Sequence, residues 1–295
     1  MSRDGSRLAR CFARLSAEGR KALGVYLTAG DPDLATTRAL VLEAARRGAD
    51  FVELGVPFSD PTADGPTIQR AAERALAAGT TLPAVLDSLR AIRDESDVPV
   101  VLFGYYNPFF AFAQEGGRFR PERLARAVKE AGADGILVVD LPVEELHEIK
   151  PACDAAGLDT IVLVAPTTPP ARLAAAAALG RGFLYYISVT GVTGARDRLS
   201  PELAERLAAV RARVSLPVVV GFGISTPAQA AEAARYADGV VVGSALVRLV
   251  EAEAAAVRPG GSGAAGAGGA AGDPGSCERL VRAVGDFVAA LKGAL

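Results

Sequence analysis

The sequence predicts an α/β protein of the (β/α)8 TIM-barrel class, with one extra helix before the first strand. Short apolar runs rich in β-branched residues alternate with stretches of helical period, and eight such runs can be counted. These runs are nearly continuous in apolar residues, as expected for parallel strands that are covered on both faces. The chain has 295 residues, a length that suits one large barrel.

The expected strands are rich in Val, Leu, Ile and Phe. They span Leu23–Ala29, Asp50–Val56, Val98–Tyr105, Gly135–Asp140, Thr160–Ala165, Phe183–Ser188, Pro217–Gly221 and Gly239–Val242. Several of the expected helices carry a proline in the first turn, where proline is well tolerated. These helices span Asp33–Arg47, Leu82–Asp94, Pro121–Ala131, Val143–Ala156, Pro170–Leu179, Pro201–Val214 and Pro227–Tyr236. The extra helix, Arg7–Glu18, is placed to cover the bottom of the barrel.

One segment near the end departs from this alternation. Arg258–Ser276 consists almost entirely of Gly, Ala, Ser and Pro, so it cannot bury enough apolar surface to order itself. We therefore expect a flexible loop there, followed by a final helix over Glu278–Lys292 that serves as the eighth helix of the barrel. Because the stretch after the loop is too short to be a domain, we predict a single domain over residues 1–295.

Composition excludes several classes of protein. The net charge is −2 and no long basic run is present, which argues against a nucleic-acid partner. Three scattered cysteines without metal or CxxC spacing indicate a reducing compartment. The first residues contain no apolar signal segment, and the apolar runs are too short to span a bilayer. We expect a soluble cytoplasmic protein.

Candidate catalytic residues follow the second expected strand, because active sites of this fold lie at the carboxyl ends of the strands. Glu53 lies within an apolar run, so its carboxylate either points into the barrel mouth or is buried without a partner. Burial raises the pKa of a carboxylic acid, which suits a general acid–base. Asp60 and Asp64 follow on a loop rich in Pro and Gly, a candidate lid. Alternatively, Glu53 is half of a structural ion pair and the two aspartates only form turns.

Two glycine-containing segments predict a phosphate site. Gly221–Ser225 follows the seventh expected strand and Gly243–Ala245 follows the eighth, which are the positions where barrels of this class recurrently bind phosphate. Glycine lets backbone N–H groups approach an anion closely. Each segment taken alone could be a tight turn. Thr190–Ala195, after the sixth strand, is a second candidate lid, a further phosphate contact or an ordinary connection.

Other chemistry is disfavoured by the residues present. The only histidine, His147, lies among glutamates in an expected outer helix, which favours a solvated surface role. No Cys, His and carboxylate cluster has metal-site spacing. No GxGxxG segment opens a βαβ unit, and no GxSxG nucleophile elbow is present.

Six segments, in the same order along the chain, resemble the tryptophan synthase alpha chain family. They are Tyr26–Pro32 (YLTAGDP), Glu53–Pro66 (ELGVPFSDPTADGP), Tyr105–Pro108 (YYNP), Asp140–Glu145 (DLPVEE), Gly191–Gly194 (GVTG) and Gly221–Ser225 (GFGIS). The resemblance runs from about residue 20 to about residue 250, and its longest motif is the specific one at 53–66. It implies a lyase that cleaves indole-3-glycerol phosphate into indole and glyceraldehyde 3-phosphate.

The same resemblance implies roles for individual residues. Glu53 corresponds to the acid–base that protonates C3 of the indole ring, and Asp64 to the carboxylate that stabilises charge at the indole N–H. Thr193 corresponds to a lid threonine that meets the aspartate of the loop after the second strand. The implied substrate-pocket residues are Tyr26, Phe103, Tyr105 and Tyr185, and the implied phosphate contacts are Gly194, Phe222, Gly223, Gly243 and Ser244. No metal or organic cofactor is implied for this chain.

The implied partner is the PLP-dependent beta chain, in an α2β2 tetramer. Departures from the family pattern are few: Tyr26 stands where Phe is more usual, Thr62 where Leu is common, and no basic residue immediately precedes Gly191. Two other phosphate-binding barrel enzymes are weaker alternatives. A phosphoribosylanthranilate isomerase lacks the 53–66 motif, and an indole-glycerol phosphate synthase needs a catalytic lysine that the expected strands do not supply. A regulatory partner with an idle site is disfavoured because Glu53 and Asp64 are both present.

Overall fold

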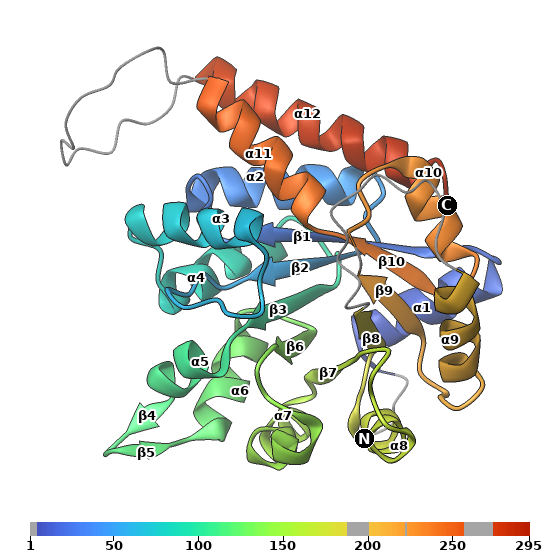
Figure 1. The fold of residues 1–295 in the computed structure, drawn as a ribbon. Helices are drawn as coiled ribbons and strands as arrows, with labels where there is room; N and C mark the ends of the chain where they lie inside the picture. Colours follow the sequence, from blue (N-terminus) through green and yellow to red (C-terminus); the bar gives the residue numbers. More distant parts are fainter. Residues whose placement is uncertain (1–4, 188–200, 222, 257–273) are drawn as a thin grey trace.

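A computed structural model describes residues 5–187, 201–221, 223–256 and 274–295, and its main sheet is a closed barrel of eight parallel strands (Figure 1). The strands are β1 Ala22–Thr28, β2 Phe51–Gly55, β3 Val100–Gly104, β6 Gly135–Val138, β7 Asp159–Val164, β8 Leu184–Ile187, β9 Val218–Gly221 and β10 Gly239–Val242. They close in the order β1-β10-β9-β8-β7-β6-β3-β2. The expected fold class is therefore confirmed, and each of the eight strands lies within about two residues of its predicted bounds or inside them.

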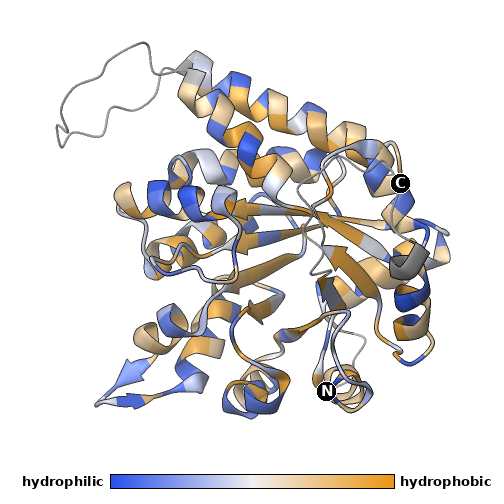
Figure 2. Cartoon of the chain, viewed as in Figure 1, coloured by the Kyte–Doolittle hydropathy of each residue, from blue (hydrophilic) through white to orange (hydrophobic). Residues whose placement is uncertain are grey.

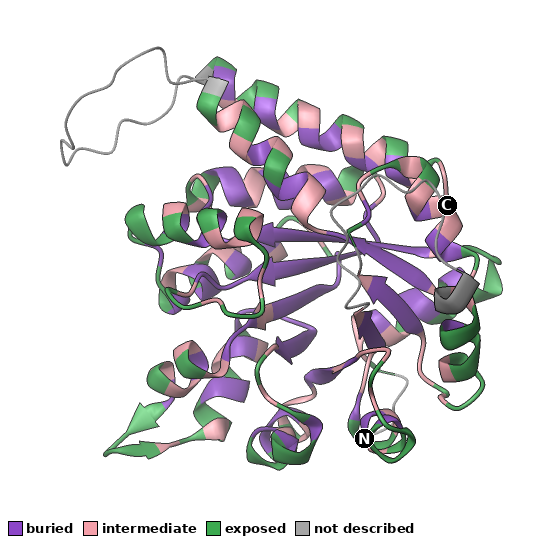
Figure 3. Ribbon diagram, in the orientation of Figure 1, coloured by how far each residue is buried: buried purple, intermediate pink, exposed green. Residues whose placement is uncertain are grey.

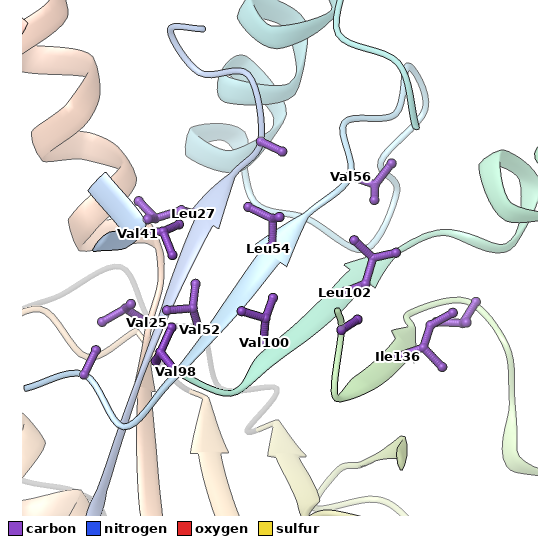
Figure 4. Packing of buried hydrophobic residues seen from close by; sticks show 14 of the residues in the cluster. Val25, Leu27, Val41, Val52, Leu54, Val56, Val98, Val100, Leu102 and Ile136 are labelled. Atoms are coloured by element: carbon purple, nitrogen blue, oxygen red, sulfur yellow. The ribbon is translucent and has the colours of Figure 1, made fainter. Parts of the chain in front are cut away.

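Two apolar cores, one on each face of the sheet, explain why the strand sequences are nearly continuous in apolar residues. Outward side chains such as Val25, Leu54 and Leu102 pack against the helices (Figure 4), while inward side chains such as Phe51 and Val101 fill the barrel. The strands are buried along nearly their whole length (Figure 3). Figure 2 shows the strands as mostly hydrophobic and the helices as striped, because each helix buries only one face.

The surrounding helices confirm most of the predicted ones. They are α2 Leu34–Arg46, α4 Leu82–Arg93, α6 Pro121–Glu130, α8 Pro170–Leu179, α9 Pro201–Arg211, α10 Pro227–Ala234 and α12 Pro274–Lys292. Helix α12 packs against both α2 and α10, which is the place of the eighth barrel helix. No helix in the described ranges is long and apolar enough to cross a membrane.

The predicted first helix closes the bottom of the barrel. Helix α1 spans Arg7–Ala17, and Ser6 caps it by accepting a hydrogen bond from the amide of Ala9. Its Phe12 ring lies 6.0 Å from the ring of Phe51 and 5.7 Å from that of Phe183. These rings seal the amino-terminal end of the barrel, so the open end must be the carboxyl end of the strands.

Two predicted boundaries were wrong. The expected helix over Val143–Ala156 is divided into a 3-10 helix, η1 Val143–Glu148, and α7 Lys150–Ala156. Pro151 explains the break, since proline has no N–H to continue the helix across this point. The last helix begins at Pro274 rather than Glu278, so the end of the predicted loop, 274–276, is helical. Residues 257–273 of that loop lie outside the described part of the chain.

Five elements were not predicted. Three are helices, α3 Pro66–Ala77, α5 Tyr106–Phe112 and α11 Ser244–Ala256, and two are short strands of one hairpin, β4 Gln114–Glu115 and β5 Arg118–Phe119. Helices α3 and α11 are rich in Ala, Leu, Glu and Arg, which are strong helix formers. Both begin where a candidate functional motif ends, and the glycine in each of these two motifs indicates only a loop. Helices α11 and α12 lie side by side (Figure 1).

Candidate active site

Glu53 lies at the centre of the barrel, on β2. Its neighbours in register are Tyr26 on β1 and Val101 on β3, and both of these belong to the inner core. The side chain is 1% exposed, and its Oε1 atom is buried without a hydrogen-bond partner. Burial raises the pKa of Glu53 from the ordinary 4.5 to about 8. Because no cation among the described residues pairs with Glu53, the structure argues against a structural ion pair.

Asp64 is held by the hydroxyl of Tyr105. Tyr105 donates a hydrogen bond of 2.9 Å to Oδ2 of Asp64, and the amide of Ala63 donates one of 3.0 Å to the same hydroxyl. Burial raises the pKa of Asp64 to about 6, and the bond from Tyr105 opposes the rise. The 53–66 loop therefore does more than make turns, because it delivers a partly desolvated carboxyl group to the barrel mouth.

The start of α3 fixes this loop. Gly65 is the N-cap of α3, and Gln69 in the first turn donates hydrogen bonds to the carbonyl oxygens of Asp64, at 2.8 Å, and Pro61, at 3.4 Å. Asp60 differs from Asp64, since it is exposed and its carboxylate accepts a hydrogen bond of 2.5 Å from its neighbour Ser59. The loop thus presents one aspartate to the pocket and leaves the other at the surface.

Three aromatic side chains line the space around the two carboxyl groups. The rings of Tyr26 and Phe103 meet edge to face at 5.2 Å, and Tyr185 is buried in the same inner core. Burial raises the pKa of both tyrosines, and the charges of Glu53 and Asp64 raise each of them further. The two phenols therefore stay protonated, and both lie close enough to the two acids for the acids' charges to act on them.

Two glycines make room for the phenol groups. A β-carbon on Gly55 would lie 2.2 Å from the Tyr26 hydroxyl oxygen, and one on Gly221 would lie 2.0 Å from that of Tyr185. Both glycines stand at the carboxyl ends of strands, so any larger residue would push a phenol out of the pocket. The hydroxyl of Tyr26, the departure from the family pattern, accepts a hydrogen bond of 3.4 Å from Thr28.

Three of the predicted phosphate positions, Gly223, Gly243 and Ser244, follow neighbouring strands. Strands β9 and β10 are neighbours in the barrel, so Gly223 and Gly243 follow adjacent strand ends. Gly223 has a φ of +50°, in the left-handed region that favours glycine. Ser244 begins α11, which places a helix N-terminus at this edge. Phe222, Thr193, Gly194 and the rest of Thr190–Ala195 lie outside the described residues.

Comparison with known proteins identifies the family to which this chain belongs. The family model for the tryptophan synthase alpha chain matches residues 12–260. The chain belongs to the tryptophan synthase alpha chain family. The alpha chain of Citrifermentans bemidjiense is 56% identical over 246 residues, which cover 83% of this chain and 90% of that protein. The alpha chain of Geobacter sulfurreducens is 55% identical over 246 residues, with the same coverage.

Solved structures of the family agree in fold. The tryptophan synthase subunit alpha of Legionella pneumophila superimposes with a TM-score of 0.83 at 36% identity, covering 98% of both chains. A chain from the tryptophan synthase a2b2 complex of Pyrococcus furiosus gives a TM-score of 0.78 at 34% identity, covering 92% of this chain and 98% of that one. The fold of this family member is therefore that of its solved relatives.

Two features of this family member were not foreseen from sequence. One is the hydrogen bond from Tyr105 to Asp64, which joins two motifs 41 positions apart. The other is the α11 N-terminus behind Gly243, which its helix-forming composition could have revealed. The surface role predicted for His147 is confirmed, because the ring is exposed and its Nδ1 lies 3.0 Å from the carbonyl oxygen of Glu144. Within the described residues, no three His, Cys, Asp or Glu side chains are grouped as a metal site.

Proposed function

We propose that the mouth of this barrel is the site at which the chain, a tryptophan synthase alpha subunit, cleaves indole-3-glycerol phosphate to indole and glyceraldehyde 3-phosphate. The observation that carries the proposal is Glu53. It is a carboxyl group with a pKa raised to about 8, inside an apolar barrel and without an ion-pair partner in the described residues. A buried acid that is mostly protonated at neutral pH can deliver a proton to carbon.

The cleavage is a retro-aldol reaction in which Glu53 handles the protons. Its protonated carboxyl group transfers a proton to C3 of the indole ring, and the ring nitrogen becomes cationic. The resulting carboxylate accepts the proton of the hydroxyl on the side-chain carbon that is bonded to C3. The carbon–carbon bond then breaks, its electron pair returns to the ring, and indole and the aldehyde are released. Glu53 ends the cycle protonated, so the reaction needs no other proton source.

Asp64 acts at the opposite end of the indole ring. An ionised carboxylate beside the ring N–H stabilises the positive charge that develops after C3 is protonated. Tyr105 holds that carboxylate by the hydrogen bond to Oδ2. Tyr26, Phe103 and Tyr185 enclose the ring and exclude water. The phosphate is the fixed handle, for which we propose Gly194, Phe222, Gly223, Gly243 and Ser244 as contacts and Thr193 as the lid residue.

The proposal includes a partner and a place of action. The alpha subunit works with a tryptophan synthase beta chain in an α2β2 assembly, in the cytoplasm. PLP is required only by the beta chain, and this chain contributes no cofactor of its own. Since catalysis needs the loop of Asp64 closed over the substrate, a partner that binds the closed arrangement accelerates the lyase.

The proposal is tested by assaying the purified chain for indole release across pH. The active form carries Asp64 ionised and Glu53 protonated. We therefore expect kcat/KM to be maximal between about pH 6 and about pH 8, the two raised pKa values. A chain that releases no indole, alone or with a beta chain, would be a regulatory subunit. An activity that keeps rising above pH 9 would mean that an ionised base, and not a protonated Glu53, starts the reaction.

A further inference from the structure

A network of charged side chains ties three segments behind the site. Arg74 on α3 donates to both carboxylate oxygens of Asp31, through Nε and Nη2, each at 2.8 Å. Its third nitrogen, Nη1, donates to Oε1 of Glu251 on α11 at 2.9 Å. Arg70, one helical turn before Arg74, binds both oxygens of Glu251, at 2.8 and 2.9 Å. One guanidinium therefore contacts a strand end and a second helix at once.

The three segments in this network each lead to the active site. Helix α3 begins at Pro66, two positions after Asp64. Helix α11 begins at Ser244, next to Gly243, and Glu251 lies about two turns further along it. Asp31 follows the end of β1, within the motif of residues 26–32 that contains Tyr26. Each of the three segments that carry the network is therefore continuous in the chain with a residue of the proposed site.

The Asp31 end of the network makes it more than a surface ion pair. Asp31 is 4% exposed, and burial raises its pKa while the hydrogen bonds from Arg74 oppose that rise. A guanidinium is a planar fork of donors with fixed geometry, so a bidentate bond sets an orientation as well as a distance. The second bond to Glu251 then fixes α11 relative to α3. A lysine at position 74 would keep the charge but could not hold both carboxylates in this geometry.

We propose that Arg74 is a positioning residue of the lyase, which sets the distance between the carboxyl group of Asp64 and the phosphate contacts at the start of α11. The inference rests on the proposed function. The substrate carries its indole ring and its phosphate at opposite ends, so both ends must be held at one spacing for the reacting carbon to meet Glu53. Loss of the network leaves each end of the site intact but lets the spacing vary.

Two variants and a control test this role. Arg74→Lys keeps the charge, and the double variant Arg74→Gln with Asp31→Asn removes the contacts of Arg74 with Asp31 and Glu251 without leaving a buried carboxylate unpaired. Arg70 keeps its own pair with Glu251 in both variants. The matched control is Arg38→Lys, which disturbs the exposed contacts of Arg38 on α2 with Glu95, at 3.0 and 2.5 Å, and lies outside the Arg74 network. Thermal unfolding first identifies a temperature at which all the proteins are folded.

Two readouts then separate positioning from a merely structural role. The first is kcat/KM for indole-3-glycerol phosphate, which needs both ends of the site, and the second is the Kd of glycerol 3-phosphate, which needs only the phosphate end. We expect both Arg74 variants to lose at least ~10-fold in kcat/KM, mostly in kcat, while the Kd changes by less than ~2-fold. The Arg38 control should change neither.

Unchanged kcat/KM in the folded Arg74 variants would overturn the proposal. An equal loss in kcat/KM and in glycerol 3-phosphate affinity would overturn it too, since that result means that α11 itself is damaged. The wild-type protein separates this inference from the function on which it rests. If the wild type releases no indole, the proposed function has failed; if it does and only the Arg74 prediction fails, the function stands.

Discussion

The aspartates at the strand starts and the two carboxyl groups of the proposed site are used in opposite ways. At the amino-terminal end, aspartates just before or at the strand starts are paired with arginine or lysine. In the proposed site, Glu53 has no ion-pair partner in the described residues, and the side chain of Asp64 accepts a hydrogen bond from the phenol of Tyr105. A carboxylate that is neutralised by its neighbours stabilises the fold, whereas one that is buried without compensation has its pKa displaced and becomes available for chemistry.

A repeated contact shows how the amino-terminal end works. In three strand pairs, the aspartate before one strand accepts a hydrogen bond from a backbone amide at the start of the preceding strand. These bonds run from Leu23 to Asp50 at 2.8 Å, from Val100 to Asp134 at 2.9 Å and from Val218 to Asp238 at 2.9 Å. Each aspartate is also paired with a cation: Lys292 at 2.5 Å for Asp50, Arg7 at 3.1 Å and Arg93 at 3.2 Å for Asp134, and Arg211 at 2.8 Å for Asp238. The bonds fix strand register at the closed end of the barrel, away from the substrate.

The largest expected effect on stability comes from breaking this closed end. Asp134 is 1% exposed and serves two arginines and a backbone amide. Asp134→Ala leaves the buried amide of Val100 without its acceptor and removes the carboxylate that Arg7 and Arg93 share, so we expect a loss of ~3–5 kcal/mol in the free energy of unfolding. Denaturant titration measures the loss. The folded variant should retain its kcat/KM. A variant with normal stability but impaired turnover would show that Asp134 serves catalysis and not the fold.

Asp64→Asn should have the complementary effect at the open end. The amide keeps the shape and can still accept a bond from Tyr105, but it carries no charge to stabilise the cationic indole ring. We expect kcat to fall by ~10²-fold, with the melting temperature equal to or above that of the wild type. Steady-state kinetics and thermal unfolding on the same samples provide the test. A fall in melting temperature as large as that of Asp134→Ala would place Asp64 among the structural carboxylates.

A smaller and more specific effect is expected from Tyr105→Phe. The hydrogen bond from Tyr105 lowers the pKa of Asp64 against the effect of burial. Without it, the pKa of Asp64 rises above about 6, and the acid limb of the kcat/KM profile moves to higher pH. The limb near pH 8, set by Glu53, should not move. A profile in which both limbs shift together would mean that the two carboxyl groups titrate as one coupled pair.

The sequence predicted the scaffold better than the connections at its open end. The eight strands were predictable because each is a continuous apolar run, and Glu53 was noticeable as the charged residue within such a run. Helices α3 and α11 were not predicted because the glycine-containing motifs of Asp64 and Gly243 lead directly into them, and such motifs indicate a loop rather than the start of a helix. Contacts such as Tyr105 to Asp64 and Arg74 to Asp31 depend on the closure of the barrel, which brings separate motifs together in a way that spacing along the chain does not encode.

The raised pKa of Glu53 should also make the stability of the protein depend on pH. Its pKa is 4.5 as an ordinary glutamate and about 8 in the folded chain. Between these values the folded state binds a proton that the unfolded state has lost, so this contribution to stability is complete below about 4.5 and is lost as pH rises to about 8. The free energy of unfolding falls by at most ~1.4 kcal/mol for each pH unit in this range. Glu53→Gln cannot ionise, so its stability relative to the wild type should increase over this range.

Glu53→Gln therefore tests the central claim most directly, by turnover and thermal unfolding measured together at pH 6 and pH 9. The account predicts at least a ~10²-fold loss of indole release, because the amide cannot transfer the proton to C3. It also predicts a melting temperature no lower than that of the wild type at pH 6 and clearly higher at pH 9. Near-normal turnover with unchanged unfolding, or a melting temperature that falls at both pH values, would contradict the assignment of Glu53 as the buried acid of this lyase.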